Sequence, residues 1–153
     1  LLKNEYSYRA PPTLLNQGSC AFKPHLVARG RQAAAHNTVT VNSQGAVQVW
    51  GTDGLGQQPT RLQAHVEQEP QLGAGVEITH NGFGRRWLHT RRLFLNAAGD
   101  NLRGEDVLAG PGQATVRAYF HLAPKIQVKL KSKVEAELSG PGLPPLALKV
   151  RGG

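Results

Sequence analysis

The sequence predicts an all-β fold, an antiparallel β-sandwich with Gly- and Pro-rich loops, and three observations support this prediction. Apolar and polar side chains alternate over most of the chain after residue 38, as they do in strands with one buried face. Turn residues separate these runs at short intervals, and the chain contains 18 Gly and 10 Pro. No amphipathic helix of useful length interrupts them. Short alternating strands joined by such turns are typical of a sandwich.

The first two strands are expected to form a hairpin. Residues 38–41 and 46–50 are rich in β-branched side chains, and residues 42–45 between them are typical turn formers. Residues 51–59 form a Gly-rich loop. The next strand is predicted over residues 62–67, where Leu, Ala and Val alternate with Gln, His and Glu.

A second hairpin is expected to turn at Asn81-Gly82, because both residues tolerate a positive φ. The strand before this turn covers residues 76–80. The strand after it covers residues 85–95. A strand–turn–strand unit is therefore predicted in the middle of the chain.

The remaining strands show the same alternation. A turn at residues 97–101 precedes them, and the Pro-rich residues 141–145 interrupt them near the end of the chain. These strands are expected over residues 102–108, 116–120, 126–130, 134–138 and 146–150.

A domain boundary is expected near residue 30. Prolines and an Asn-Gln-Gly run break any period in residues 1–30, which we interpret as an irregular leader and the remnant of an upstream part. Residues 31–153 then form one β-sandwich domain that is truncated at both ends. The chain of 153 residues begins with Leu1 and contains no Met, as expected for a piece of a longer polypeptide.

The chain is strongly basic. Its 18 Lys and Arg against 10 Asp and Glu give a net charge of +8. Such a charge attracts nucleic acid, anionic lipid or an acidic polysaccharide, and a solvated basic surface is the alternative. Nucleic acid is disfavoured because no zinc finger, helix-turn-helix or aromatic–basic run is found. No membrane span is expected, since no run approaches the ~18 apolar residues that one requires.

Candidate binding residues precede the first strand. Arg31 is followed by small residues and then by His36-Asn37, which lead into the strand. A sheet holds such a histidine in place, which suits a ligand or a proton carrier, and a structural role is the alternative. The single cysteine, Cys20, excludes an internal disulfide and a thiolate zinc cluster, and we expect an idle thiol there.

The other histidines offer no second metal ligand at a convincing spacing, because no H-x-H or H-x-x-x-H pair occurs. They are His25, His65, His80, His89 and His121.

Arginines and tryptophans provide further candidates. A strip of guanidinium groups would match carboxylates or sulfates, and surface charge is the alternative. The candidates for this strip are Arg31, Arg85, Arg86, Arg91 and Arg92. In an extended strand Arg91 and Arg92 point to opposite faces, so at most one of them lines a given groove. Trp50 and Trp87 have the shape to stack on sugar rings, but a tryptophan in a sandwich is more often part of the core.

The segment around His36 resembles a known family. Arg31, the run from His36 to Val39, and then Gln48 and Trp50 are similar to the C-terminal β-sandwich of heparinase II/III-like polysaccharide lyases. The resemblance covers roughly residues 25–130.

Later residues continue the resemblance in the same order. A basic–apolar strand precedes a turn with acidic residues, and a His precedes a Pro near the end of the resemblance. These residues are Arg91–Leu95, Gly99-Asp100, Leu102, Glu105-Asp106, His121 and Pro124. Asn42 stands where many relatives carry Asp, at a turn position that accepts either residue.

The resemblance implies a two-part enzyme, in which an N-terminal α/α toroid and this sandwich hold an acidic polysaccharide between them. Lyases of this kind remove the proton at C5 of a uronate and expel the 4-O substituent by β-elimination. The base and the acid are typically Tyr and His from the toroid and from an H-x-H-x-D segment, neither of which this sequence contains. No catalytic residue is therefore assigned, and the fragment alone is expected to be inactive.

By resemblance, the substrate-binding residues are Arg31, His36, Asn37, Trp50 and Arg91. In relatives that bind zinc, the residue matching His36 is one ligand, so we expect zinc in the full-length parent and no cofactor on this fragment. The implied partners are an acidic polysaccharide and the missing toroid, and the implied location is the bacterial periplasm or outside the cell. A non-catalytic carbohydrate-binding or structural β-sandwich module is the alternative function.

Overall fold

The computed structural model describes residues 29–50 and 54–152, and the predicted leader up to residue 28, with Cys20, lies outside them. The described residues form two compact units, 29–119 and 120–152. The predicted all-β class is confirmed, because several antiparallel sheets account for most of this part of the chain. A 3-10 turn, η1 (Ala33–Ala35), precedes the first strand. Within the described residues, no helix has the length and apolar character needed to cross a membrane.

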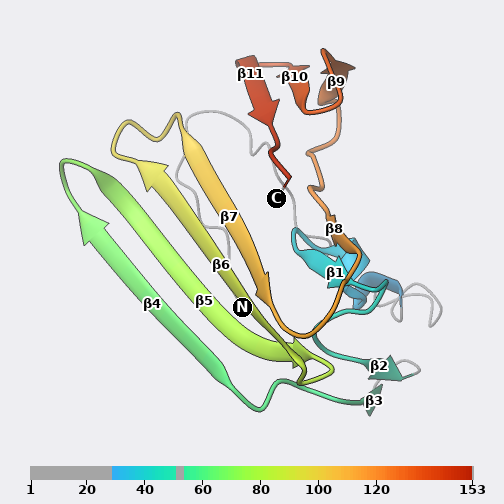
Figure 1. Cartoon of the computed structure of the whole chain (residues 1–153). Helices are drawn as coiled ribbons and strands as arrows, with labels where there is room; N and C mark the ends of the chain where they lie inside the picture. The colour runs from blue at the N-terminus through green and yellow to red at the C-terminus, as the bar shows by residue number, and fades with distance from the viewer. Residues whose placement is uncertain (1–28, 51–53, 153) are drawn as a thin grey trace. The chain divides into compact units, whose positions relative to one another are not determined.

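A four-stranded antiparallel meander dominates the first unit (Figure 1). Its strands lie side by side in chain order and are β4 (Leu62–Glu69), β5 (Gly73–Phe83), β6 (Trp87–Asn96) and β7 (Leu102–Ala109). The predicted turn after residue 96 is confirmed, with Gly99 at a φ of 73°. Chain order and short turns together make this sheet the simplest antiparallel arrangement of four consecutive strands.

The register of this meander separates its two faces. On one face, Val76 lies opposite Val66 and Leu93, in a row of apolar side chains. The other face is charged, because Arg92 forms ion pairs with Glu77 and Glu105 at 2.6 and 2.8 Å. Neighbouring residues of a strand therefore lie on different faces, as the alternating sequence predicts. The buried face expected for the strand that begins at residue 62 is absent, because every residue of β4 is exposed.

The central hairpin forms, but its turn does not lie where the sequence predicts. β5 continues through Asn81 and Gly82 to Phe83, and the chain reverses at Gly84 and Arg85, which have φ values of 66° and 60°. The register shifts between residues 80 and 83, so a bulge separates the regular part of the hairpin from its end.

Tertiary contacts explain why the Asn-Gly pair is not the turn. Asn81 Oδ1 accepts hydrogen bonds from the main-chain N–H groups of Thr60 and Arg61, at 3.0 and 2.9 Å. Gly82 lies so close to Ala46 that a Cβ would come within 2.5 Å of the Ala46 carbonyl oxygen. Asn81 therefore bonds the segment before β4, and Gly82 packs closely against the segment before β2, so this pair does not reverse the chain.

The predicted hairpin between residues 38–41 and 46–50 is wrong. β1 (Val39–Val41) pairs with β8 (Val116–Ala118), and β2 (Val49–Trp50) pairs with β3 (Gly54–Leu55). The turn itself is present, with Asn42 and Ser43 at positive φ. However, Asn42 Oδ1 accepts a hydrogen bond from the main-chain N–H of Thr115. This bond links the turn after β1 to the residue just before β8, the strand with which β1 pairs.

The core of the first unit lies where β1 packs on one end of the meander. Val39 is 1% exposed, and it clusters with Val41 of β1 and Phe83 of β5. Trp87 and Leu108, from β6 and β7, pack against this cluster. Two layers therefore cover each other here, and Trp87 has the core role that sandwich tryptophans usually have.

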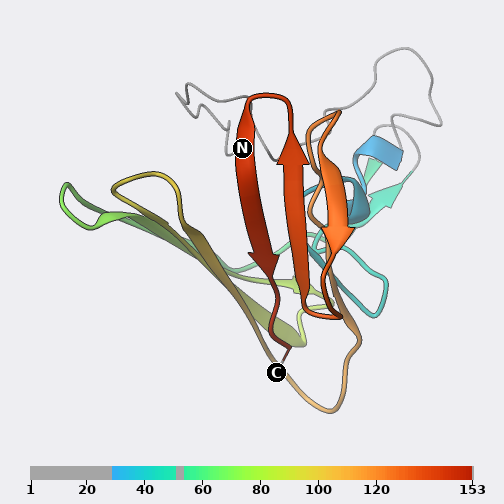
Figure 2. The same ribbon diagram turned by 90° about the horizontal axis from the view of Figure 1, so that it is seen from above.

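The second unit is a three-stranded antiparallel sheet, in which β10 (Glu135–Gly140) lies between β9 (Gln127–Leu130) and β11 (Leu143–Lys149) (Figure 2). Ala136 and Leu138 of the central strand are buried. β11 begins earlier than predicted and contains two prolines, which an edge strand tolerates.

Candidate functional site

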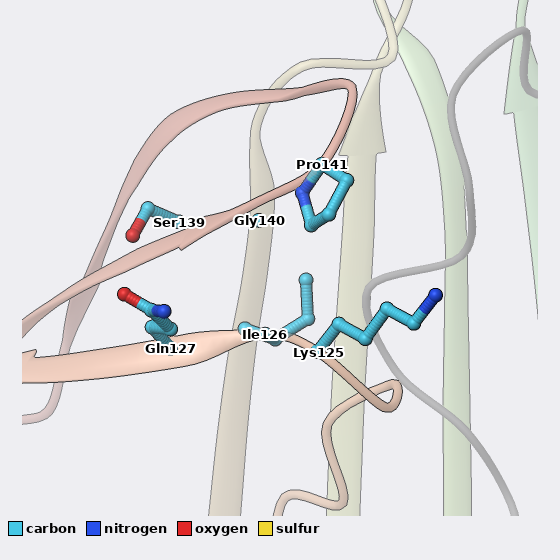
Figure 3. A pocket seen from close by; sticks show the side chains of 6 residues that line it. All are labelled: Lys125, Ile126, Gln127, Ser139, Gly140 and Pro141. Atoms are coloured by element: carbon cyan, nitrogen blue, oxygen red, sulfur yellow. The ribbon is translucent and has the colours of Figure 1, made fainter.

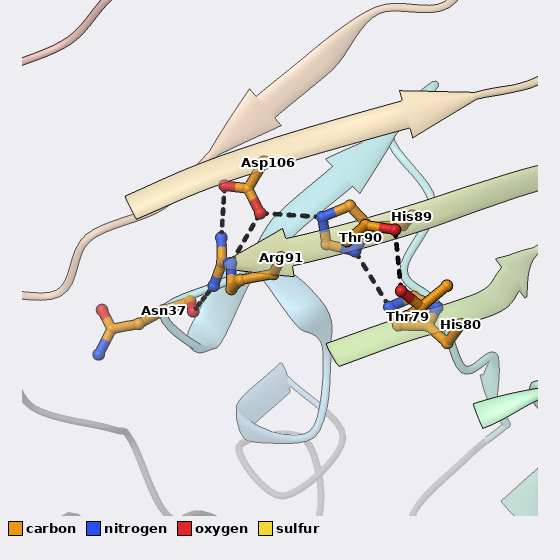
Figure 4. A network of polar contacts seen from close by, with 7 residues as sticks. All are labelled: Asn37, Thr79, His80, His89, Thr90, Arg91 and Asp106. Atoms are coloured by element: carbon orange, nitrogen blue, oxygen red, sulfur yellow. Dashed lines mark hydrogen bonds and ion pairs between the residues drawn. The ribbon is translucent and has the colours of Figure 1, made fainter. Parts of the chain in front are cut away.

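Asp106 of β7 is the hub of a polar network on the meander (Figure 4). Its carboxylate accepts two hydrogen bonds from Arg91 of β6, from Nε to Oδ1 at 2.7 Å and from Nη2 to Oδ2 at 2.8 Å. Its Oδ1 also accepts from Nε2 of His89 at 2.9 Å. Arg91 and Asp106 are direct cross-strand partners, so the pleat of the sheet directs both side chains to the same face.

The network continues from His89 to the next strand. His89 Nδ1 lies 3.1 Å from Nε2 of His80, and Nδ1 of His80 accepts the main-chain N–H of Gly82 at 3.1 Å. Because Gly82 donates, His80 has its proton on Nε2 and donates it to His89. His89 in turn donates from Nε2 to Asp106. Both rings are thus held in one tautomer, and every ring nitrogen has a protein partner.

The electrostatics of the network follow from burial and charge. Burial of the ring, followed by repulsion from His89 and Arg91, lowers the pKa of His80 from 6.5 to about 4. Burial tends to raise the pKa of Asp106, but the hydrogen bonds from His89 and Arg91 outweigh it and hold that pKa well below its ordinary value. Asp106 is therefore a carboxylate, and His80 a neutral imidazole, at neutral pH.

The segment before β1 meets this network through its backbone. Arg91 donates from Nη1 to the main-chain carbonyl oxygen of Asn37 at 2.6 Å. Two of the predicted substrate-binding residues, Arg91 and Asn37, are thus brought together, although 54 positions separate them. Figure 4 shows the Asn37 side chain pointing away from the guanidinium that its carbonyl contacts.

Two other predicted residues share a hollow beside β1. Arg31 and His36 line a cavity of about 250 Å³, together with Ala33, Thr38, Val39, Ala46 and Val47. Trp50 is not among these lining residues. Its side chain lies on β2 and is 65% exposed. The structure therefore places the five predicted residues in three groups. Arg31 and His36 line the cavity, Arg91 bonds the backbone of Asn37, and Trp50 is exposed on β2.

Sequence reasoning missed the histidines of the network. It treated His80 and His89 as scattered, because their spacing fits no metal motif, and it assigned Asp106 no role in a site. The register of the hairpin was the available signal, since it makes His80 and His89 direct cross-strand partners. Placing the turn at Asn81-Gly82 concealed this pairing.

The described residues do not provide a zinc site. No group of three His, Cys, Asp or Glu side chains among them is arranged to hold a metal ion. A tetrahedral site needs three or four protein ligands. A site that included His36 would therefore have to take at least one ligand from outside the described part of the chain.

A separate hollow lies in the second unit (Figure 3). Its volume is about 580 Å³, and its lining residues are Lys125, Ile126, Gln127, Ser139, Gly140 and Pro141. Lys125 has a φ of 73°, which sets the bend before β9. In Figure 3 the Lys125 amine points away from the Gln127 amide and the Ser139 hydroxyl, so these groups do not converge on one ligand position.

Together, the fold and the site define an all-β domain in which a sheet holds a histidine-bearing segment through an Arg–Asp pair. Residues 5–144 match the family model described as heparinase II/III-like, C-terminal. The chain therefore belongs to the family of heparinase II/III-like C-terminal domains. No curated protein and no solved structure matches it.

Proposed function

We propose that this chain is the C-terminal domain of a polysaccharide lyase that cleaves uronate-containing polysaccharide by β-elimination, and that it supplies one wall of the substrate cleft. The family supports the reaction class, and the pair formed by Arg31 and His36 in one hollow supports the location of the wall. The net charge of +8 favours a polyanionic substrate. An N-terminal toroid supplies the other wall.

The reaction defines what the domain must provide. A base takes the proton from C5 of the uronate, the C4–O bond breaks, a C4=C5 double bond forms, and an acid protonates the leaving oxygen. Negative charge develops on the carboxylate as the C5 proton leaves, so a nearby cation stabilises the transition state. Arg31 is suited to bind this carboxylate, since guanidinium and carboxylate form paired hydrogen bonds. His36 and Asn37 provide neighbouring contacts to the sugar. The base and the acid come from the rest of the enzyme.

The test is the activity of the full-length protein that contains this domain. Purified enzyme is incubated with heparin-like, alginate-like and oligo-uronate substrates, and the ultraviolet absorbance of the unsaturated product is recorded. We expect absorbance with at least one substrate and a loss of about 10²-fold in kcat/KM for His36→Ala. His65→Ala is the matched control, because His65 is an exposed histidine of β4 that bonds Glu67. Enzyme that forms no unsaturated product from any uronate polymer would refute the proposal.

Zinc binding belongs to the same proposal. His36 would be one ligand in the full-length enzyme, with at least one other ligand supplied outside the described residues. Metal analysis of the purified full-length enzyme, together with zinc titration by calorimetry, tests it. We expect one zinc per chain, lost in His36→Ala. Absence of zinc binding to the full-length wild type would refute it.

One observation favours a second function, a non-catalytic carbohydrate-binding module. Trp50 is 65% exposed, and an exposed indole ring is suited to stack on a sugar face. This function predicts binding of the polysaccharide without product formation, and weaker binding in Trp50→Ala. The lyase proposal predicts product formation, so the same absorbance assay separates the two.

The expected location is the bacterial periplasm or the extracellular space. Polymeric uronates occur outside the cytoplasm, and the family supports an enzyme that acts on them there. Fractionation of the source cells, with the domain detected by antibody, tests this location. Recovery in the cytoplasmic fraction alone would contradict it.

A further inference from the structure

Arg91 connects strand β6 of the meander to the segment before β1, which carries His36. Arg91 Nη1 donates to the Asn37 carbonyl oxygen at 2.6 Å, and the next amide, that of Thr38, donates to the carbonyl of His36 at 2.8 Å. The backbone on both sides of Asn37 is therefore bonded, and the position of the Arg91 guanidinium bears directly on the position of His36.

The Arg91 guanidinium is itself oriented by the carboxylate of Asp106. Asp106 binds it through two parallel hydrogen bonds, a geometry that fixes orientation as well as distance. The Arg91 side chain is 16% exposed, so bulk water screens the pair much less than it screens a surface ion pair. His89 is 3% exposed and donates to the same carboxylate oxygen. The carboxylate is thus fixed by two side chains of the inner strand β6.

The chain of contacts ends inside the protein. Each nitrogen of His80 and His89 bonds a protein group, and the last bond closes on the Gly82 main chain. A ligand or substrate proton would have to displace one of these bonds. The arrangement therefore suits the support of a neighbouring group better than reaction with a ligand.

We infer that Arg91, oriented by Asp106 and His89, is a positioning residue that holds the His36-Asn37 segment against the cleft. This inference rests on the proposed function for its effect on activity. Its structural part, the restraint of residues 36–38 by Arg91, stands on the hydrogen bonds alone.

The chain contains a matched control. Arg92 is the next residue of β6 and also bonds carboxylates on the two neighbouring strands, Glu77 and Glu105. It lies on the opposite face of the sheet. Arg92→Lys and Glu105→Gln therefore repeat the chemistry of Arg91→Lys and Asp106→Asn without altering the bond to Asn37.

The first measurement is amide hydrogen exchange of the full-length protein by mass spectrometry. We expect Arg91→Lys and Asp106→Asn each to speed exchange in the peptide that contains the Thr38 amide by roughly tenfold or more, since each loses a charge-assisted hydrogen bond. Arg92→Lys and Glu105→Gln should leave this peptide unchanged. The thermal midpoint of each variant shows whether the change is local or global.

The second measurement is a double-mutant cycle on kcat/KM in the full-length enzyme. A residue that acts through His36 should lose its effect when His36 is absent, so Arg91→Lys should lower kcat/KM by roughly tenfold in the wild type and much less in His36→Ala. A purely structural residue would give equal losses in both backgrounds.

The outcomes separate the two claims. Unchanged exchange at residues 36–38 in both Arg91→Lys and Asp106→Asn, or the same change in the Arg92→Lys control, overturns the positioning role. Additive losses in the cycle also overturn it. An enzyme without lyase activity refutes the proposed function, and the exchange measurement still decides the restraint of residues 36–38 by Arg91.

Discussion

The ring of His80 on β5 lies 3.1 Å, from Nε2 to Nδ1, from the ring of His89 on β6, and the two planes meet at 72°. The two histidines are cross-strand partners beside Phe83, which contacts both rings. An apolar ring and a second imidazole disfavour a positive charge on His80. This relationship makes the network sensitive to acid.

Stability should fall as the pH drops from 6.5 towards 4. The pKa of His80 is about 4 in the folded protein and 6.5 without its surroundings, so the unfolded chain takes up a proton that the folded one does not. The contribution of neutral His80 to the free energy of unfolding is fully present above pH 6.5 and is lost as the pH falls towards 4. The expected loss is about 1–2 kcal/mol after discounting for solvent screening. Urea unfolding across this range measures it. His80→Gln should flatten the dependence, whereas His65→Gln should not.

Gly82→Ala should destabilise the first unit by about 2 kcal/mol or more, because the new Cβ would lie 2.5 Å from the Ala46 carbonyl oxygen. Gly75→Ala is the control on the same strand. There the Cβ meets the nearest atom of Phe94 at 3.6 Å, an ordinary contact, and the lower entropy of the unfolded chain favours alanine. Equal unfolding free energies for the two variants would contradict this close approach.

Val39→Ala should lower the free energy of unfolding by about 2 kcal/mol, since it leaves a cavity between β1 and the meander. Val39 is 1% exposed and lies in the buried cluster with Val41 and Phe83. Val66→Ala on β4 makes the same chemical change at a side chain that is 70% exposed. Denaturant melts should show a loss of under about 0.5 kcal/mol for this control. A similar loss in both variants would place the core elsewhere.

Thr40→Val should stabilise the protein by about 1 kcal/mol. Thr40 is 4% exposed, and its hydroxyl finds no hydrogen-bond partner within the described part of the chain. Valine has nearly the same shape without the polar atom. Thr79→Val is the opposite case, because Thr79 Oγ1 bonds Thr90 Oγ1 at 2.9 Å, and its loss should destabilise the protein. Calorimetric melting of the two variants should therefore give shifts of opposite sign.

Local pattern was sufficient for most strands. The alternation in residues 62–67, 102–108 and 126–130 led to strands in the structure, but not to the buried face that it indicates, since every residue of β4 and β9 is exposed. The alternation did predict that successive side chains of a strand point to opposite faces. The opposite faces of Arg91 and Arg92 followed from the same geometry. Chain-local signals therefore identified the class of fold and the family.

Pairing was decided by contacts far apart in the chain. The turn at Asn42 had the residues of a hairpin, yet β1 pairs with β8, because the Asn42 side chain bonds Thr115. The Asn81 side chain likewise bonds the backbone of residues 60 and 61, and the reversal occurs at Gly84 and Arg85 instead. A turn signal gives the preference of four residues, and hydrogen bonds from those residues to distant segments of the chain decide whether the reversal occurs there.

The sequence by itself determined that this chain is all-β, basic and similar to a heparinase II/III-like C-terminal domain, and it singled out Arg31, His36 and Arg91. Only the tertiary structure decided that Arg91 bonds Asp106 and the Asn37 carbonyl, and that His80 and His89 complete that network. The physical reason is register. A cross-strand partner depends on where the chain reverses, and the position of that reversal depends on contacts with distant residues.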